Sequence, residues 1–273
     1  MPTVCLSNDL TVSCLQKHDV AIVNAEVQTY FENGITVKPG DIVVDVGANI
    51  GLFALGAWMR TEGDIQIHCL EPVAAVFKIL EENLRRYDDG STLIAHCFGL
   101  SDRTGSVEFA YYPNAPVLST AYPEAEADHQ EVKQATLTNI MYMPEAPVQL
   151  KMLKLFPSHL REWIIERALR RTLQYKAVRC ELKTLSQFTA EQGIPRIDLL
   201  KIDAEKAELD ILRGIVPDDW ARIRQIVVDV HDIDNRLETV LNMLHDCGLK
   251  RIVVDQPPTL HGSSIYTLLA IRS

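Results

Sequence analysis

From Asp41 onward, short apolar segments rich in β-branched residues alternate with longer segments of helical length. The first pair is DIVVDVGA followed by IGLFALGAWMRT, and the second is IQIHCLEP followed by VAAVFKILEENLRRY. A short apolar run without polar alternation is typical of a strand that is buried on both faces. Strands that alternate with helices predict an α/β fold with a doubly wound, mostly parallel sheet.

The same alternation continues along the rest of the chain. We expect further strands in STLIAHCFGL, IDLLKIDA, RQIVVDVH, KRIVVDQ and SIYTLLAIR, and further helices in KAELDILRGI and NRLETVLNMLHDCG. GSVEFAYYP begins with a glycine turn and predicts an added β element. The sequence shows no internal repeat, and it predicts a single domain over residues 1–273.

Two regions depart from this alternation. Residues 1–40 precede the first core strand and predict an N-terminal cap. Residues 113–176 are too long for an ordinary connection, so we expect a lid or substrate-binding insertion, with a helix in SHLREWIIERALRRTLQY. The alternative for this region is a packed surface insertion without chemistry.

Composition excludes several classes of protein. A net charge of −10 disfavours a nucleic-acid binder with a basic surface. No apolar run reaches the length of a membrane span, and MPTVCLSNDLTVSC lacks the regions of a signal peptide. We therefore expect a cytoplasmic protein without a membrane partner. Scattered cysteines without a C-x-x-C pair predict buried, reduced thiols, at Cys5, Cys14, Cys69, Cys97, Cys180 and Cys247.

The turn after the first strand predicts a nucleoside site. Gly47 and Gly51 leave room for a ligand at the start of a helix, where backbone N–H groups point outward. Their spacing differs from the dinucleotide pattern G-x-G-x-x-G. Glu71, at the end of the second strand, is placed to accept both hydroxyls of a ribose.

Asp45 indicates which nucleoside this is. A carboxylate directly before the turn would repel the pyrophosphate of a dinucleotide. S-adenosylmethionine carries an ammonium and a sulfonium instead, so Asp45 would bind its methionyl amino group directly or through water. The alternative is that Asp45 only caps the following helix.

Four segments, in this order, resemble the FkbM family of S-adenosylmethionine-dependent methyltransferases: DVGANIGLF, CLEP, GLSDRTGSVEF and LLKIDAEKAELDILRGI. The resemblance runs from about Tyr30 to the last residues and implies a Rossmann-like class I methyltransferase with a seven-stranded sheet. VLSTAYPEAEAD and DDWARIRQIVVDVHD are similar to O-methyltransferases of polyketide and nonribosomal peptide assembly lines. The chain departs from the common family form at Lys206, where glycine is usual, and at Asp229, where many members have glutamate.

The resemblance implies a set of cofactor contacts. The methionyl end would be surrounded by the turn after the first strand, the ribose and adenine by the ends of the second and third strands, and the pocket would be closed by a tyrosine of the cap. In this sequence these residues are Asp45, Gly47, Ala48, Asn49, Gly51, Glu71, Pro72, Gly99, Leu100, Ser101 and Tyr30.

The catalytic candidates follow two later strands, because reacting groups of a doubly wound sheet lie beyond the carboxyl ends of the strands. His231 suits a general base for an alcohol acceptor at neutral pH, with Asp229 on the same face of the strand. Asp203 could orient the cofactor or the acceptor. Asp203, Asp229 and His231 could also bind a divalent cation, although no metal site is predicted. Glu205 and Glu208 could be solvated helix residues.

The sequence therefore predicts transfer of a methyl group from S-adenosylmethionine to a hydroxyl of a natural-product intermediate, with S-adenosylhomocysteine as the product. The acceptor is either a free small molecule or an acyl or peptidyl chain on a carrier protein. Arg161, Arg167, Arg170, Arg171 and Lys176 form a basic segment that could steer an acidic carrier protein. The alternatives are a dinucleotide-dependent oxidoreductase of similar topology and a noncatalytic cofactor-binding module.

Overall fold

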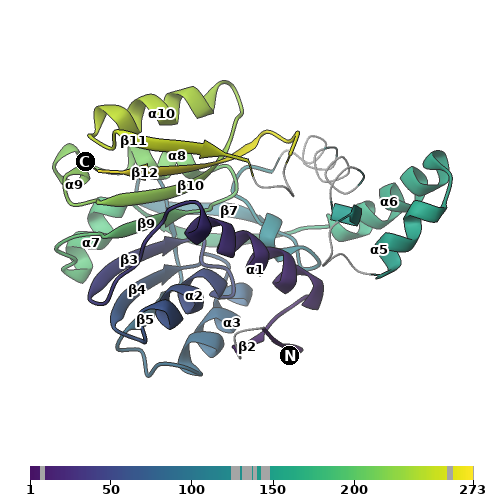
Figure 1. The fold of residues 1–273 in the computed structure, drawn as a ribbon, viewed down its shortest axis with the longest axis horizontal. Coiled ribbons are helices and arrows are strands. Elements are labelled where there is room, and N and C mark those ends of the chain that lie inside the picture. Colours follow the sequence, from purple (N-terminus) through teal and green to yellow (C-terminus); the bar gives the residue numbers. More distant parts are fainter. Residues whose placement is uncertain are drawn as a thin grey trace.

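The computed structural model places a large mixed sheet at the centre of the molecule (Figure 1). The structure describes residues 1–6, 10–123, 130, 137, 140–142, 148–256 and 261–272. Within these ranges, no helix combines the length and apolar character needed to cross a membrane.

The central sheet has seven strands in the spatial order β11–β12–β10–β9–β3–β4–β5. Neighbours from β10 to β5 run parallel, whereas β12 is antiparallel to both β10 and β11. This confirms the predicted class I methyltransferase sheet. The strands are β3 (Asp41–Val46), β4 (Ile65–Leu70), β5 (Leu93–His96), β9 (Leu199–Ile202), β10 (Gln225–His231), β11 (Arg251–Asp255) and β12 (Ile265–Ile271).

Helices cover both faces of the sheet, because successive strand residues point to opposite sides. Val43 packs into one apolar core and Val44 into the other. The first core includes residues of α1 (Lys17–Glu32), α2 (Leu52–Arg60) and α3 (Ala74–Arg85). The second includes residues of α7 (Leu185–Gln192), α8 (Glu208–Arg213), α9 (Pro217–Trp220) and α10 (Arg236–Asp246).

The segment predicted as one strand over residues 91–100 is two strands in two sheets. β5 ends at His96, and β6 (Gly99–Leu100) pairs instead with β8 (Lys176–Lys183). β8 also pairs antiparallel with β7 (Gly105–Tyr111), the predicted added element. The resulting three-stranded sheet carries the chain into and out of the insertion.

Residues 1–40 form a small hairpin and a long helix. The hairpin consists of β1 (Thr3–Cys5) and β2 (Thr11–Ser13), and Asn83 of α3 fastens it by accepting a 2.7 Å hydrogen bond from the Ser13 backbone. Helix α1 follows and packs on the first core. The cap is thus continuous with the main body.

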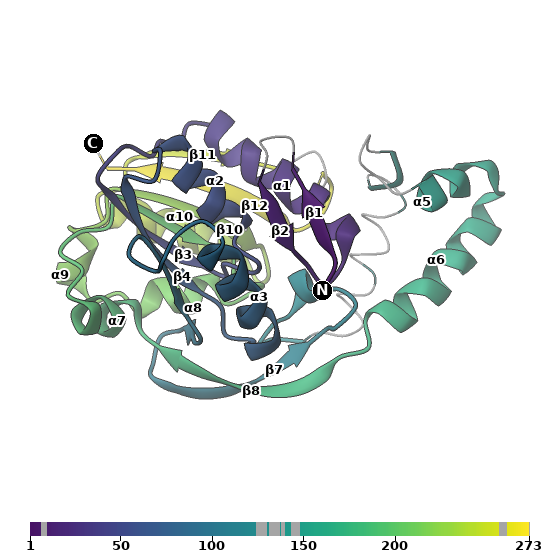
Figure 2. The same ribbon diagram turned by 90° about the horizontal axis from the view of Figure 1, so that it is seen from below.

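The insertion extends away from the central sheet in both views (Figures 1 and 2). Its predicted helix is present as α6 (Ser158–Thr172). Other described pieces are η1 (Pro116–Leu118), η2 (Ile140–Tyr142), α5 (Val148–Met152) and η3 (Leu153–Leu155). The rest of the predicted lid, residues 124–129, 131–136, 138–139 and 143–147, lies outside the described residues.

Candidate functional site

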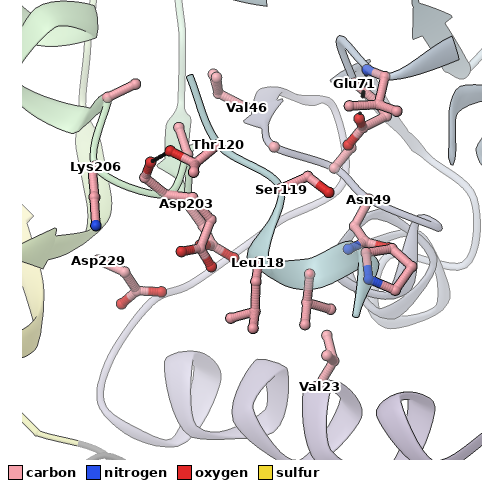
Figure 3. Close-up of a pocket in the computed structure, with 18 of the residues that line it drawn as sticks. Val23, Val46, Asn49, Glu71, Leu118, Ser119, Thr120, Asp203, Lys206 and Asp229 are labelled. Carbon is pink, nitrogen blue, oxygen red and sulfur yellow. Dashed lines mark hydrogen bonds between the residues drawn. The ribbon is translucent and has the colours of Figure 1, made fainter. Parts of the chain in front are cut away.

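A cavity of about 420 Å³ lies at the carboxyl ends of β3, β4, β9 and β10. Its volume falls in the range that binds small molecules, about 300–1,000 Å³. Helix α1 and the segment around η1 supply further parts of the wall (Figure 3). This is the edge at which doubly wound sheets bind ligands.

The turn after β3 contains two glycines with positive φ, and each has a packing reason. A Cβ on Gly47 (φ +76°) would lie 1.8 Å from the backbone oxygen of Asp203. A Cβ on Gly51 (φ +92°) would lie 3.0 Å from Leu80 of α3, and Gly51 does not line the cavity. Gly47 lines the cavity, so the sequence-based interpretation needs correction at Gly51 alone, although both glycines also make room for protein atoms.

Asp45 lies behind the cavity wall, not on it. Its fully buried carboxylate forms an ion pair with Lys201, whose Nζ lies 3.2 Å from Oδ1. The same ammonium donates a 2.9 Å hydrogen bond to the Gly47 carbonyl and lies 3.5 Å from Asp203 Oδ2. Burial raises the pKa of Asp45, and Lys201 opposes that shift. A direct contact of Asp45 with a ligand ammonium therefore does not fit this geometry; Lys201 is its partner.

Sequence reasoning missed Lys201. The signal was present, since a lysine stands inside the apolar segment LLKI. In the parallel register of β3 and β9, residues 45 and 201 are direct partners. A buried cation beside a buried anion is the expected arrangement, because burying either one alone would be costly.

Glu71 is on the cavity wall, directly after β4. Its Oε1 accepts a 2.8 Å hydrogen bond from the backbone N–H of Val73. Burial raises the pKa of Glu71 to about 7, against the opposing hydrogen bonds from the backbone of Val73 and Asn49. Ala48, Asn49 and Pro72, three further predicted contacts, also line the cavity.

The predicted adenine region is only partly on the wall. Gly99 and Leu100 line the cavity, whereas Ser101 is buried outside it and its hydroxyl donates to Asp102 at 3.2 Å. Leu118 and Ser119 of the insertion also line the cavity (Figure 3). The end of the predicted third strand turns away from the cavity because Gly99 and Leu100 belong to β6 of the three-stranded sheet.

The opposite end of the cavity is acidic. Asp203, Asp229 and Glu26 line it, from the residue after β9, from β10 and from α1. Asp203 has a side chain that is 38% exposed, while Asp229 is 5% exposed and accepts hydrogen bonds from Tyr30 Oη and Thr267 Oγ1. Burial and the charge of Asp203 raise the pKa of Asp229 to about 7, against these two hydrogen bonds and Lys201.

His231 is held between the carboxylates of Glu205, in the turn after β9, and Glu208, the first residue of α8. Nδ1 lies 3.2 Å from Glu208 Oε1, and Nε2 lies 3.4 Å from Glu205 Oε2. Burial lowers the pKa of His231, but Glu205 and Glu208 outweigh it and raise the pKa to about 11. An imidazolium with both nitrogens engaged is poorly suited to accept a proton. The two glutamates, interpreted as possibly solvated from the sequence, are instead its partners.

The turn between β9 and α8 has an unusual backbone. Glu205 (φ +46°) and Lys206 (φ +80°) both occupy the left-handed region. The carbonyl of Glu205 accepts a 2.5 Å hydrogen bond from Thr120, and the carbonyl of Lys206 accepts a 2.7 Å bond from Arg236. These contacts hold a conformation that disfavours side chains other than glycine. They explain how lysine occupies a position where the common family form has glycine.

No group of three or more histidine, cysteine, aspartate or glutamate side chains is arranged to hold a metal ion in the described part of the chain. Asp203, Asp229 and His231 all line the cavity, but they contact Lys201, the hydroxyls of Tyr30 and Thr267, and the two glutamates, respectively.

Comparison with known proteins identifies the fold and the class of reaction. A family model described as the methyltransferase FkbM domain matches residues 45–250. The chain belongs to the FkbM methyltransferase family. This membership favours a methyltransferase over the oxidoreductase alternative.

Two relatives illustrate the range of FkbM proteins. The chain is 32% identical over 274 residues to 31-O-demethyl-FK506 methyltransferase FkbM of Streptomyces tacrolimicus, covering 99% of this chain and 97% of that protein. It is 33% identical over 251 residues to AMB antimetabolite synthetase AmbE of Pseudomonas aeruginosa, covering 90% of this chain but 11% of AmbE.

A solved FkbM methyltransferase from Methylobacillus flagellatus KT has the same fold. Its TM-score to this chain is 0.52 at 14% sequence identity, covering 95% of this chain and 56% of that chain.

Proposed function

We propose that the chain transfers the methyl group of S-adenosylmethionine to a hydroxyl oxygen of a natural-product intermediate, and releases S-adenosylhomocysteine. The observation that supports this best is one cavity with Glu71 near one end and Asp203 towards the other, on the sheet edge of an FkbM methyltransferase (Figure 3).

The residues present fit this cofactor. Glu71 would accept hydrogen bonds from the ribose hydroxyls, since its carboxyl group lies on the cavity wall directly after β4. Asp203 would face the methionyl ammonium, because it is exposed to the cavity beside the turn after β3. Lys201 compensates the charge of Asp45 behind them. A wall with several carboxylates attracts a ligand that carries two positive charges.

The cofactor supplies an activated methyl group on a sulfonium. The protein then needs to align the acceptor, exclude water and receive the acceptor's proton. The apolar side chains of α1 and η1 exclude water from the cavity, while the acidic end offers carboxylates near the site of transfer.

We further propose a carrier-tethered acceptor. AmbE is named a synthetase, and this chain matches only a part of it. Helix α6 supplies an exposed basic surface, formed by Arg167, Arg170 and Arg171, on an arm that extends from the body (Figure 2). Such a surface would attract an acidic carrier protein.

Calorimetry tests the cofactor, and intact-mass spectrometry tests the reaction. We expect S-adenosylmethionine and S-adenosylhomocysteine to bind and NAD not to bind. Carrier proteins loaded with hydroxyacyl chains should gain the mass of one methylene group. Tight cofactor binding without methylation of any hydroxylated acceptor would favour the noncatalytic module instead.

A further inference from the structure

Two hydroxyl groups fix the carboxylate of Asp229 in one orientation. Thr267 Oγ1 of β12 donates to Oδ1 at 2.5 Å, and Tyr30 Oη of α1 donates to Oδ2. Burial and the charge of Asp229 raise the pKa of Tyr30 well above its ordinary value, so the phenol stays protonated and remains a donor. A carboxylate held in this way is preorganised, and each oxygen retains a second lone pair.

Asp229 lies beyond the part of the cavity assigned to the cofactor. In the close-up view, Asp203 lies between Glu71 and Asp229, and Lys206 lies beside Asp229 (Figure 3). A ligand that reaches from Glu71 to Asp203 therefore leaves the Asp229 end of the cavity for the second reactant.

Apolar side chains of the same cavity wall can hold a carbon skeleton. Ile22 and Val23 of α1, Leu118 of η1 and Leu173 after α6 all line the cavity and are partly exposed. Burying an apolar chain against such side chains is favourable by about 25 cal/mol per Å². An acceptor with an apolar skeleton and one hydroxyl would match this wall and the carboxylate at its end.

The other candidate bases are less suited. Both nitrogens of His231 already face carboxylates. Asp203 is paired with the ammonium of Lys201, so a proton placed on it would weaken an ion pair. Glu26 lines the same cavity, but no side chain or backbone group of the described residues fixes its carboxyl group by a hydrogen bond.

We propose that Asp229 is a further catalytic residue, which binds the acceptor hydroxyl and takes its proton. The inference rests on the proposed O-methylation. As the new bond forms between the acceptor oxygen and the methyl carbon, the bond from that carbon to sulfur breaks and sulfur keeps its electron pair. The O–H bond breaks in the same step, and the proton passes to the Asp229 carboxylate. Atoms and charge balance: a sulfonium and a carboxylate become a thioether and a carboxyl group.

The test compares three variants on β-hydroxyacyl thioesters of N-acetylcysteamine as probes. Asp229→Asn should lower kcat/KM by about 10²–10⁴-fold with cofactor affinity nearly unchanged. Tyr30→Phe and Thr267→Val keep the carboxylate but remove one donor each, and hydrogen bonds to the charged form lower a pKa. Both variants should therefore move the acidic limb of the kcat/KM profile to higher pH.

Other charged groups could produce a similar acidic limb in the kcat/KM profile, and they face Asp229 from α1, from β9 and from the turn after β9. They are Glu26, Asp203, Lys201, Glu205 and Lys206. None of them accepts a hydrogen bond from Thr267 in this structure, so a limb that belongs to one of them should not follow Thr267→Val.

The outcomes separate the inference from the proposed function. If the wild type methylates a probe, but Asp229→Asn retains at least about a tenth of kcat/KM, then Asp229 is not the base and O-methylation stands. If the acidic limb of the kcat/KM profile stays at the same pH in both Tyr30→Phe and Thr267→Val, the inference also fails. This second test does not require Asp229→Asn to fold. If the wild type binds the cofactor but methylates no hydroxyl probe, both are overturned.

Discussion

Gly47, which follows β3, and Asp203, which follows β9, approach so closely that only glycine fits at residue 47. A Cβ there would lie 1.8 Å from the Asp203 carbonyl oxygen, and φ is +76°. We expect Gly47→Ala to lower the free energy of unfolding by about 2–5 kcal/mol, from backbone strain and overpacking. Urea denaturation measures this, with Gly105→Ala as the control because nothing lies within 4 Å of a Cβ at residue 105. Equal stability of the two variants would contradict the close approach.

Glu71 links stability to pH. Its pKa is raised from 4.5 to about 7 by burial, so the neutral carboxyl stabilises the fold fully below about pH 4.5 and this contribution is lost as the pH rises through about 7. Without cofactor, Glu71→Gln should be more stable than the wild type by about 2–3 kcal/mol at pH 8 and nearly equal at pH 4. It should also bind S-adenosylmethionine about tenfold to a hundredfold more weakly. Unchanged affinity in calorimetry would remove the ribose contact.

His231 should act mainly on stability. It neutralises Glu208, which is fully buried, so His231→Gln should lower the free energy of unfolding by about 3–5 kcal/mol. Because its pKa is raised from 6.5 to about 11, the contribution is complete below pH 6.5 and is lost as the pH rises towards 11. The difference from the wild type should therefore shrink between pH 6 and pH 10. Exposed His245 of α10 provides the control; a pH-independent difference would show that no ion pair is involved.

Lys206 offers a test of backbone strain. At φ +80°, glycine is relaxed and a β-branched residue is strongly disfavoured. Lys206→Gly should thus unfold at a denaturant concentration at least equal to that of the wild type, whereas Lys206→Val should lose about 1–2 kcal/mol. Both variants lack the ammonium, so their difference isolates the backbone. Equal stabilities would mean that the turn is not left-handed in solution.

The basic surface of α6 should affect carrier-bound substrates alone. Changing Arg167, Arg170 and Arg171 to glutamate should slow methylation of a carrier-bound chain, more at low than at high salt, because exposed charges are screened. Rates on N-acetylcysteamine thioesters should stay the same. A matched control reverses three exposed arginines near the opposite edge of the sheet, Arg222, Arg224 and Arg251. Equal slowing of carrier-bound and free substrates would argue against docking.

Much of the fold could be predicted from the sequence, because buried parallel strands and their helices each leave a local pattern. The break at His96 left none, because STLIAHCFGL contains no turn signal before Gly99. The strand that pairs with Gly99 is β8, about eighty residues later. The strand β8 was not predicted either, because its pairing with residues far away in the sequence leaves no local pattern.

In the candidate site, residue types were easier to predict than their partners. The pattern placed Glu71, Asp203, Asp229 and His231 at the cavity edge. It could not show that Glu205 and Glu208 turn back onto His231, since that depends on two left-handed residues for which the sequence offers no glycine. Nor could it show that the ammonium of Lys201, rather than that of a ligand, pairs with Asp45.

The insertion leaves the body after Tyr111 and returns at Lys176, and these two residues are paired across β7 and β8. An excursion whose ends already touch can be lengthened, shortened or exchanged without moving either strand. Evolution could therefore change the insertion while the central sheet stays constant. The same junction gives protein engineers a place to graft the insertion of one relative onto the body of another.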